Sequence, residues 1–258
     1  MRFFVEIAYD GTAYSGWQVQ PNKQTIQGQF NRILSQIHQE EIHVVGCGRT
    51  DAGVHASQYF FHFDTQKRIH IDLAHKLNQM LPADIVAYRV FDVEEEQHSR
   101  FNAIQRAYTY HMHFERNPFR ERFSSYCYHK NLKTNLMKEA ATLLTTYTDF
   151  APVSKVADEQ LNTLCTVQQC NLLIVEEQAR VQLHVSANRF LHNMIRRIMG
   201  LLVSVGREKI SISEIKEVFE SGSELSLNVV SPPQGLFLSK VSYPFIKKEP
   251  PKGSSSSH

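Results

Sequence analysis

Apolar and polar residues in the first hundred positions follow two periods, one typical of strands and one of helices. Residues 2–9 alternate and are rich in β-prone side chains, which predicts a strand. Further strands are expected at 42–45, 57–63 and 85–90. Helical spacing after Thr25 predicts a capped helix carrying Ile26, Phe30, Ile33, Leu34 and Ile37, and a second helix runs from Asp72 to Leu81-Pro82. The order β-α-β-β-α-β is that of a ferredoxin-like unit, with two helices on one face of an antiparallel sheet.

The same order of elements returns after the charged connection at 92–100. The pattern predicts a strand at 107–114, a helix around Leu136 to Leu144, a hairpin of 161–175 and 180–187 turning near 176–178, a helix at 189–205, a short helix capped by Ser213 and a last strand at 235–241. We therefore expect a mixed α/β (α+β) protein of two ferredoxin-like lobes with antiparallel sheets. The lobes span 1–104 and 105–246, and a tail at 247–258, with two prolines and a serine run, is expected to be disordered.

One connection is more tightly shaped than the others, the run from Gly46 to His55. It holds three glycines within eight residues, with Arg49, Thr50 and Asp51 between them. Glycine serves where backbone needs positive φ or close approach, and Asp and Thr favour turns. Asp51 is either a structural acid that bonds backbone amides or an exposed reactive acid. Composition alone favours the structural reading. A second glycine-containing loop, at 10–17, carries two aromatics that look exposed, Tyr14 and Trp17.

Composition excludes several classes of protein. The chain has 258 residues, 42% hydrophobic and 21% charged, which suits a globular protein with a sizeable core. No apolar run is long enough to span a bilayer, and the early Arg2 argues against a signal peptide, so we expect a cytoplasmic protein. The four cysteines have neither disulfide nor zinc-site spacing. No Walker, Gly-x-Gly-x-x-Gly or Gly-x-Ser-x-Gly motif supports nucleotide cofactors or serine hydrolysis.

Three groups of side chains remain as candidates for binding. On a helix at 189–205, Arg189, His192 and Arg196 would share one face, which suits an anion or is simply solvated. Tyr108 and Tyr110 lie on one side of a strand, where they stack on a base or pack in the core. A loop at 116–133 mixes basic and aromatic residues and either follows a phosphate backbone or is a solvated connection: Arg116, Phe119, Arg120, Arg122, Phe123, Tyr126, Lys130 and Lys133. His111 and His113 lack the further ligands that a metal needs. The net charge of +2 does not decide between these readings.

Six blocks follow one another along the chain: Tyr9–Gly11 with Tyr14–Gln18, Gly48–His55, Asn78 with Leu81–Ile85, His98–Ala103 with Arg106–Tyr110, Ala187–Gly200 and Pro233–Leu238. Together they resemble the TruA family of tRNA pseudouridine synthases, and Gly48–His55 resembles the family's signature. The resemblance implies the pseudouridine synthase fold and isomerisation of uridine in the tRNA anticodon stem-loop, at positions 38, 39 or 40. It also implies a homodimer, with no metal and no cofactor.

The resemblance also implies a role for individual residues. Asp51 would attack the target uridine, Tyr108 would stack on the uracil and assist proton removal, and Arg196 would keep Asp51 ionised. Arg49 would contact the RNA backbone, and the other substrate-binding residues would be Thr50, Arg100, Arg189 and His192.

One departure from the family keeps alternatives open. Cys165 stands where family members usually carry an arginine, which leaves room for a paralogue with another tRNA target. A non-catalytic RNA-binding protein on the same scaffold, or a ferredoxin-like metal or small-ligand protein, are the alternatives of other classes.

Overall fold

The computed structural model describes residues 1–67, 69, 72–129, 131–153, 162–175, 179–223, 225 and 229–246. Three expectations lie outside the described residues: the turn at 176–178, the basic residue Lys130 and the tail at 247–258.

The first lobe has the predicted order of elements. These are β1 (Arg2–Tyr9), α1 (Ile26–His38), β2 (Val45–Gly46), β3 (His55–Asp64), α2 (Leu73–Met80) and β4 (Ile85–Val93). The strands pair antiparallel in the order β4-β1-β3-β2. Thr25 accepts from the backbone N–H of Gly28, and Asp72 accepts from that of His75, so both predicted N-caps are confirmed.

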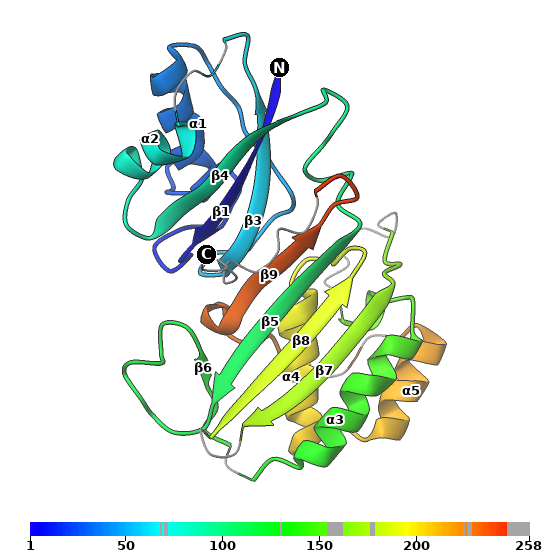
Figure 1. Cartoon of the computed structure of the whole chain (residues 1–258). Helices are drawn as coiled ribbons and strands as arrows, with labels where there is room; N and C mark the ends of the chain where they lie inside the picture. Colours follow the sequence, from blue (N-terminus) through cyan, green and yellow to red (C-terminus); the bar gives the residue numbers. More distant parts are fainter. Residues whose placement is uncertain are drawn as a thin grey trace, which may run out of the picture.

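The second lobe repeats this arrangement with an added helix. Its elements are β5 (Gln105–His113), β6 (Ser125–Tyr126), α3 (Thr134–Leu143), the 3-10 turns η1 (Leu144–Thr146) and η2 (Ala151–Val153), β7 (Val167–Val175), β8 (Arg180–Ala187), α4 (Met194–Gly206), α5 (Ile212–Ser221), η4 (Pro233–Gly235) and β9 (Leu236–Ser242). The strand order is β9-β5-β8-β7, and α3, α4 and α5 lie on one side of it (Figure 1). The ferredoxin-like order is thus confirmed in both halves.

The two sheets are joined into one, which the sequence did not predict. Strand β9 lies between β3 and β5 (Figure 1) and pairs parallel with β3 through His55 with Phe237 and Ala56 with Leu238. Side chains of β9 also enter both hydrophobic cores, because Leu236 belongs to the second and Leu238 to the first. The boundary near residue 104 stays a prediction.

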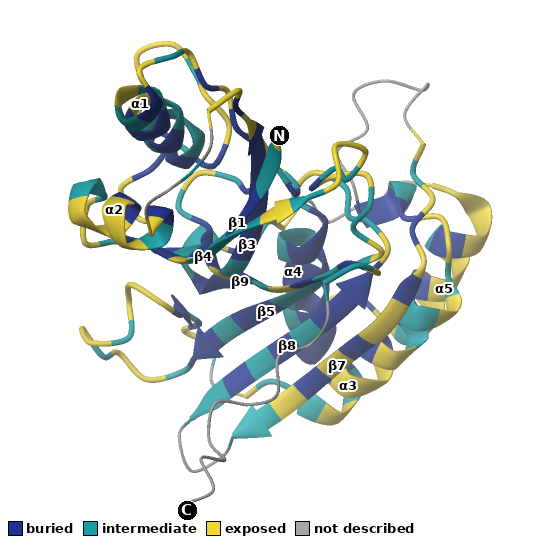
Figure 2. Cartoon of the chain, turned by 45° about the horizontal axis from the view of Figure 1, so that its top comes forward, coloured by how far each residue is buried: buried dark blue, intermediate teal, exposed yellow. Residues whose placement is uncertain are grey.

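Burial follows these two cores. Figure 2 shows buried residues along β5 and β8, and exposed ones on the edge strand β7 and the outer sides of α2 and α5. Tyr14 and Trp17, which looked exposed in the sequence, are buried at 5% and 3% exposure. That expectation was wrong because Trp17 stacks on Tyr59 of β3, with ring centroids 4.2 Å apart.

Two helix boundaries differ from prediction. The helix expected at 189–205 begins only at Met194, because Asn193 takes a left-handed conformation with φ of 59°. Arg189 and His192 therefore precede the helix instead of sharing a face with Arg196. The cap of α5 is Ser211 and not Ser213, since Ser211 and Glu214 form a complete capping box.

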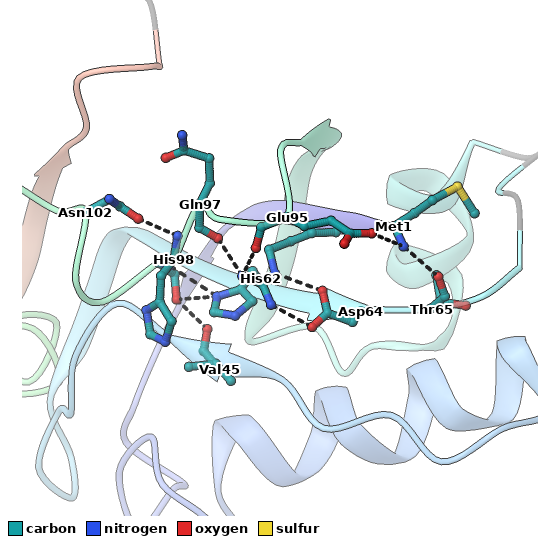
Figure 3. Close-up of polar contacts among 11 residues, drawn as sticks. Met1, Val45, His62, Asp64, Thr65, Glu95, Gln97, His98 and Asn102 are labelled. Atoms are coloured by element: carbon teal, nitrogen blue, oxygen red, sulfur yellow. Dashed lines mark hydrogen bonds and ion pairs between the residues drawn. The ribbon is translucent and has the colours of Figure 1, made fainter.

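The connection between the lobes, residues 94–104, is held to the first lobe by hydrogen bonds (Figure 3). The hydroxyl of Ser99 donates to the carbonyl of Val45 (2.6 Å) and lies 2.9 Å from Nδ1 of buried His62. Arg2 donates to both carboxylate oxygens of Asp64 and to the carbonyl of Gln97. Burial, together with the nearby cations, lowers the pKa of His62 to about 4. This histidine is therefore neutral at physiological pH.

Candidate active site

The glycine-rich run forms the connection between β2 and β3 and contains a β-turn around Asp51. The backbone N–H of Val54 donates to the carbonyl of Asp51 (3.1 Å). Gly53, the third residue of this turn, has φ of +75°, a conformation that type II turns require and that side chains disfavour. The turn leaves the Asp51 side chain partly exposed, at 25%.

Both ends of this loop are buried, in different cores. Cys47 is fully buried in the first-lobe core, and Val54 is 1% exposed in the core of the second lobe. Burying a valine side chain contributes roughly 1.5–3 kcal/mol. Burial also raises the pKa of the Cys47 thiol to about 11, so this cysteine is a neutral packing residue.

Two buried tyrosine hydroxyls hold the middle of the loop. Tyr59 donates to the carbonyl of Gly48 (2.5 Å), and the hydroxyls of Tyr9 and Thr50 lie 2.8 Å apart. The backbone N–H of Trp17 donates to the carbonyl of Thr50 (3.1 Å). The loop is thus held before Asp51 by these bonds and after it by buried Val54. Sequence reasoning missed Tyr9 and Tyr59, because a strand tyrosine carries no local sign of what its hydroxyl contacts.

Two side chains of the second lobe, an arginine and a histidine, face Asp51. Arg196 Nη1 lies 3.5 Å from Asp51 Oδ2, and His192 Nε2 lies 3.4 Å from Oδ1. Arg196 is itself held, because it donates to the carbonyl of Ser231 (2.7 Å) and to Oδ1 of Asn193 (3.0 Å). Asp51 therefore faces the first turn of α4, where the helix dipole also favours negative charge.

Tyr108 lies between the two lobes. It is half-buried, packs against both hydrophobic cores and meets Phe190 edge to face at 5.1 Å. Burial raises its pKa, the charge of Asp51 raises it further and the guanidinium of Arg106 opposes the rise. The side chain is therefore a neutral aromatic near the carboxylate. Its expected companion Tyr110 is fully buried and donates to the carbonyl of Pro232 (2.8 Å), so it belongs to the core.

The remaining candidates lie in different settings. Arg49 and Arg100 are exposed, and the Arg100 guanidinium lies 5.9 Å from the centre of the Phe101 ring. Arg189 is half-buried. Burial raises the pKa of the Cys165 thiol, and the nearby charge of Arg189 opposes that rise. Thr50 is 7% exposed, and its hydroxyl contacts Tyr9.

The basic and aromatic loop between β5 and α3 reaches back to the first lobe. Arg122 forms an ion pair with Asp10 (2.5 Å), and the adjacent Gly11 donates its backbone N–H to His55 Nδ1 (3.1 Å). His55 is fully buried and stacks on Phe237 of β9, with ring centroids 4.6 Å apart. By contrast, Phe119 in the same loop is 91% exposed. One arginine of this loop is therefore engaged with the protein, while its most prominent aromatic faces solvent.

The described part of the chain contains neither a candidate metal cluster nor a candidate membrane-spanning helix. No group of three or more His, Cys, Asp or Glu side chains there could hold a metal ion. Among the same residues, no helix combines the length and the apolar character needed to cross a membrane.

Comparison with known proteins agrees with this geometry. The family model described as tRNA pseudouridine synthase matches residues 6–104 and 140–244, ranges that include Asp51 and Arg196. A protein of Porphyromonas gingivalis named tRNA pseudouridine synthase A is 37% identical over 246 residues, covering 94% of this chain and 97% of its own length. Proteins of the same name from Bacteroides fragilis and Azobacteroides pseudotrichonymphae are 38% and 35% identical, again over 94% of this chain and over 96% and 97% of theirs. The chain thus belongs to the tRNA pseudouridine synthases, a family of isomerases, and has their fold.

Proposed function

We propose that this protein converts uridine to pseudouridine in tRNA, with Asp51 as the catalytic nucleophile. The observation that carries the proposal is the position of this carboxylate. It lies on a loop fixed in both cores, and it faces Arg196 and His192 of the other lobe. Such an acid is held in one orientation, beside a guanidinium, and is partly open to a substrate.

Each group of the site has a part in the reaction. The carboxylate forms a covalent bond to the target nucleotide, and the bond between the ribose and N1 of the uracil breaks. The base rotates, its C5 bonds to the ribose, and the bond to Asp51 breaks, which returns the free carboxylate. The C5 proton is then lost and N1 gains one, so the atoms balance without a cofactor. Arg196 stabilises the carboxylate by its charge. Tyr108 stacks on the uracil and assists removal of the C5 proton.

The nucleotide has to leave its helical stack to reach this carboxylate, which costs a few kcal/mol. Stacking on an aromatic ring such as that of Tyr108 returns about 1–3 kcal/mol. We further propose that Arg49, Thr50, Arg100, Arg189 and His192 contribute to the substrate-binding surface. Exposed Arg49 and Arg100 supply positive charge for the RNA backbone.

Finer features of the proposal come from the family resemblance. We place the target in the anticodon stem-loop at positions 38, 39 or 40, the working unit as a homodimer and the reaction in the cytoplasm. Mapping pseudouridine in tRNA transcripts with each of these uridines replaced tests the position, and sedimentation tests the dimer.

The central experiment replaces the carboxylate. Asp51→Ala should fold and bind tRNA as the wild type does, yet release no tritium from tRNA labelled at C5 of uridine. Folding is checked by circular dichroism and binding by filter retention. The matched control is Asp92→Ala, which removes an exposed carboxylate of β4 and should keep the wild-type rate.

Substantial tritium release by Asp51→Ala would overturn the assignment of the nucleophile. A wild-type protein that binds tRNA but releases no tritium would favour the non-catalytic RNA-binding alternative.

A further inference from the structure

Arg106, near the start of β5, donates hydrogen bonds from its guanidinium to backbone carbonyls of three separate segments. Nε and Nη2 both donate to the carbonyl of Cys47 (3.0 and 2.7 Å), and Nη2 also donates to that of Arg100 (2.7 Å). Nη1 donates to the carbonyls of Asn188 (3.1 Å) and Ala103 (3.4 Å). A charged group bonded in this way holds backbone, and its donors are already engaged with the protein.

These carbonyls belong to the segments that build the candidate site. Cys47 opens the loop that carries Asp51. Arg100 and Ala103 belong to the connection between the lobes, and Asn188 directly precedes the segment that carries His192 and leads to α4. Arg106 therefore joins the loop that carries Asp51 to the connection between the lobes and to the segment before α4.

The position of Arg106 on its strand adds to this link. It is two residues from Tyr108 on β5, so one strand carries both the aromatic group and the arginine that bonds the loop of Asp51. Gly48, the next residue after Cys47, would place a Cβ only 3.8 Å from Arg106 Nε, so the guanidinium lies close along the loop's backbone. A guanidinium offers five donors in a rigid fork, which an ammonium group cannot reproduce.

We propose that Arg106 is a positioning residue that sets the placement of Asp51 relative to Tyr108 and Arg196. This inference rests on the proposed function, because it assigns the role through Asp51. Displacing a reacting group by about 1 Å can cost about 10²-fold in rate. Loss of the fork should therefore slow the chemical step and leave tRNA binding nearly unchanged.

The protein contains its own reporter of the loop. Trp17 is the only tryptophan, is 3% exposed and donates its backbone N–H to the carbonyl of Thr50. Its ring stacks on Tyr59, whose hydroxyl bonds Gly48. Quenching of its fluorescence by acrylamide thus reports how tightly the loop is held.

The test compares Arg106→Met and Arg106→Lys with the wild type. Under single-turnover conditions we expect tritium release to fall about 10²-fold in Arg106→Met, and by less in Arg106→Lys, which keeps the charge and part of the bonding. The dissociation constant for tRNA should change little, and Trp17 quenching should rise in both variants. Arg89→Met is the control, because Arg89 lies on β4 and bonds Glu6 away from the site.

Wild-type turnover in Arg106→Met would overturn the inference. A loss of rate that equals the loss of folded protein, or one with unchanged Trp17 quenching, would overturn it as well. Should the wild type itself release no tritium, the proposed function fails, while the quenching comparison still decides whether Arg106 holds the loop.

Discussion

At the scale of single residues, His62 links the stability of the first lobe to pH. Its ring is 3% exposed, its Nδ1 lies beside Ser99, and burial lowers its pKa to about 4. In an unfolded chain a histidine has a pKa of about 6.5. Between these two values the unfolded chain binds the extra proton, so stability rises with pH. The contribution is fully present above about pH 6.5 and is lost as the pH falls toward about 4.

The prediction is that His62→Gln flattens this dependence. In the wild type the free energy of unfolding should fall by up to about 3 kcal/mol between pH 6.5 and 4 through this one residue, at about 1.4 kcal/mol for each unit of pKa difference. Urea titrations at several pH values measure the slope. His43→Gln, at an exposed position, is the matched control for the loss of a histidine. An equal slope in wild type and His62→Gln would contradict the prediction.

At the scale of elements, α5 is capped by Ser211, whereas the sequence pattern predicted Ser213 as the cap. Ser211 accepts the backbone N–H of Glu214, and the Glu214 carboxylate accepts the backbone N–H of Ser211. Ser213 lies inside the helix and is exposed.

Ser211→Ala should therefore destabilise the protein by about 1 kcal/mol, while Ser213→Ala should change the free energy of unfolding by less than about 0.5 kcal/mol. The urea midpoints of the two variants measure the difference. A larger effect at Ser213 would show that the cap is misassigned.

The start of α4 shows why such boundaries escape sequence patterns. Phe190, Met194 and Ile198 follow one helical period, which predicts an uninterrupted helix from 189. The helix instead begins only after Asn193, whose left-handed backbone is open to asparagine but cannot be read from the residue type alone. The contact of His192 with Asp51 is made from the non-helical segment that precedes α4.

At the scale of the whole molecule, the shared strand β9 should make the lobes unfold together. Trp17 reports the first lobe alone, whereas far-ultraviolet circular dichroism reports all helices and strands. Because β9 pairs with both β3 and β5 and enters both cores, we predict that the two signals give coincident urea transitions.

Leu238→Ala should lower both midpoints equally, since it removes a buried side chain of β9 and costs about 2–5 kcal/mol. Two separated transitions would mean that the lobes are independent. Leu173→Ala, at an exposed position on β7, is the control.

Sequence reasoning reached the element order of both lobes because periods of two and 3.6 residues are local signals. It reached Asp51, Tyr108 and Arg196 through resemblance, and the structure places Arg196 beside Asp51. It could not predict that β9 joins the two sheets, that the hydroxyls of Tyr9 and Tyr59 hold the loop, or that Arg106 bonds three backbone segments. Those depend on which distant segments meet, and the pairing of β3 with β9 joins residues far apart in the chain.

The central place of β9 also sets an order of events during synthesis. The chain from the end of β3 to the start of β9 is about 170 residues long, and a ribosome adds roughly 5–20 residues per second. His55 and Ala56 of β3 therefore wait roughly 9–34 s for their partners on β9. Over that interval the nascent first lobe presents an open edge, which is where strands of other chains attach. Val54, in the loop that carries Asp51, is buried among side chains of the second lobe, so it stays outside that core until those residues have been made. Strand β9, made after the other described strands, thus joins the two sheets and adds Leu236 to the core that holds Val54.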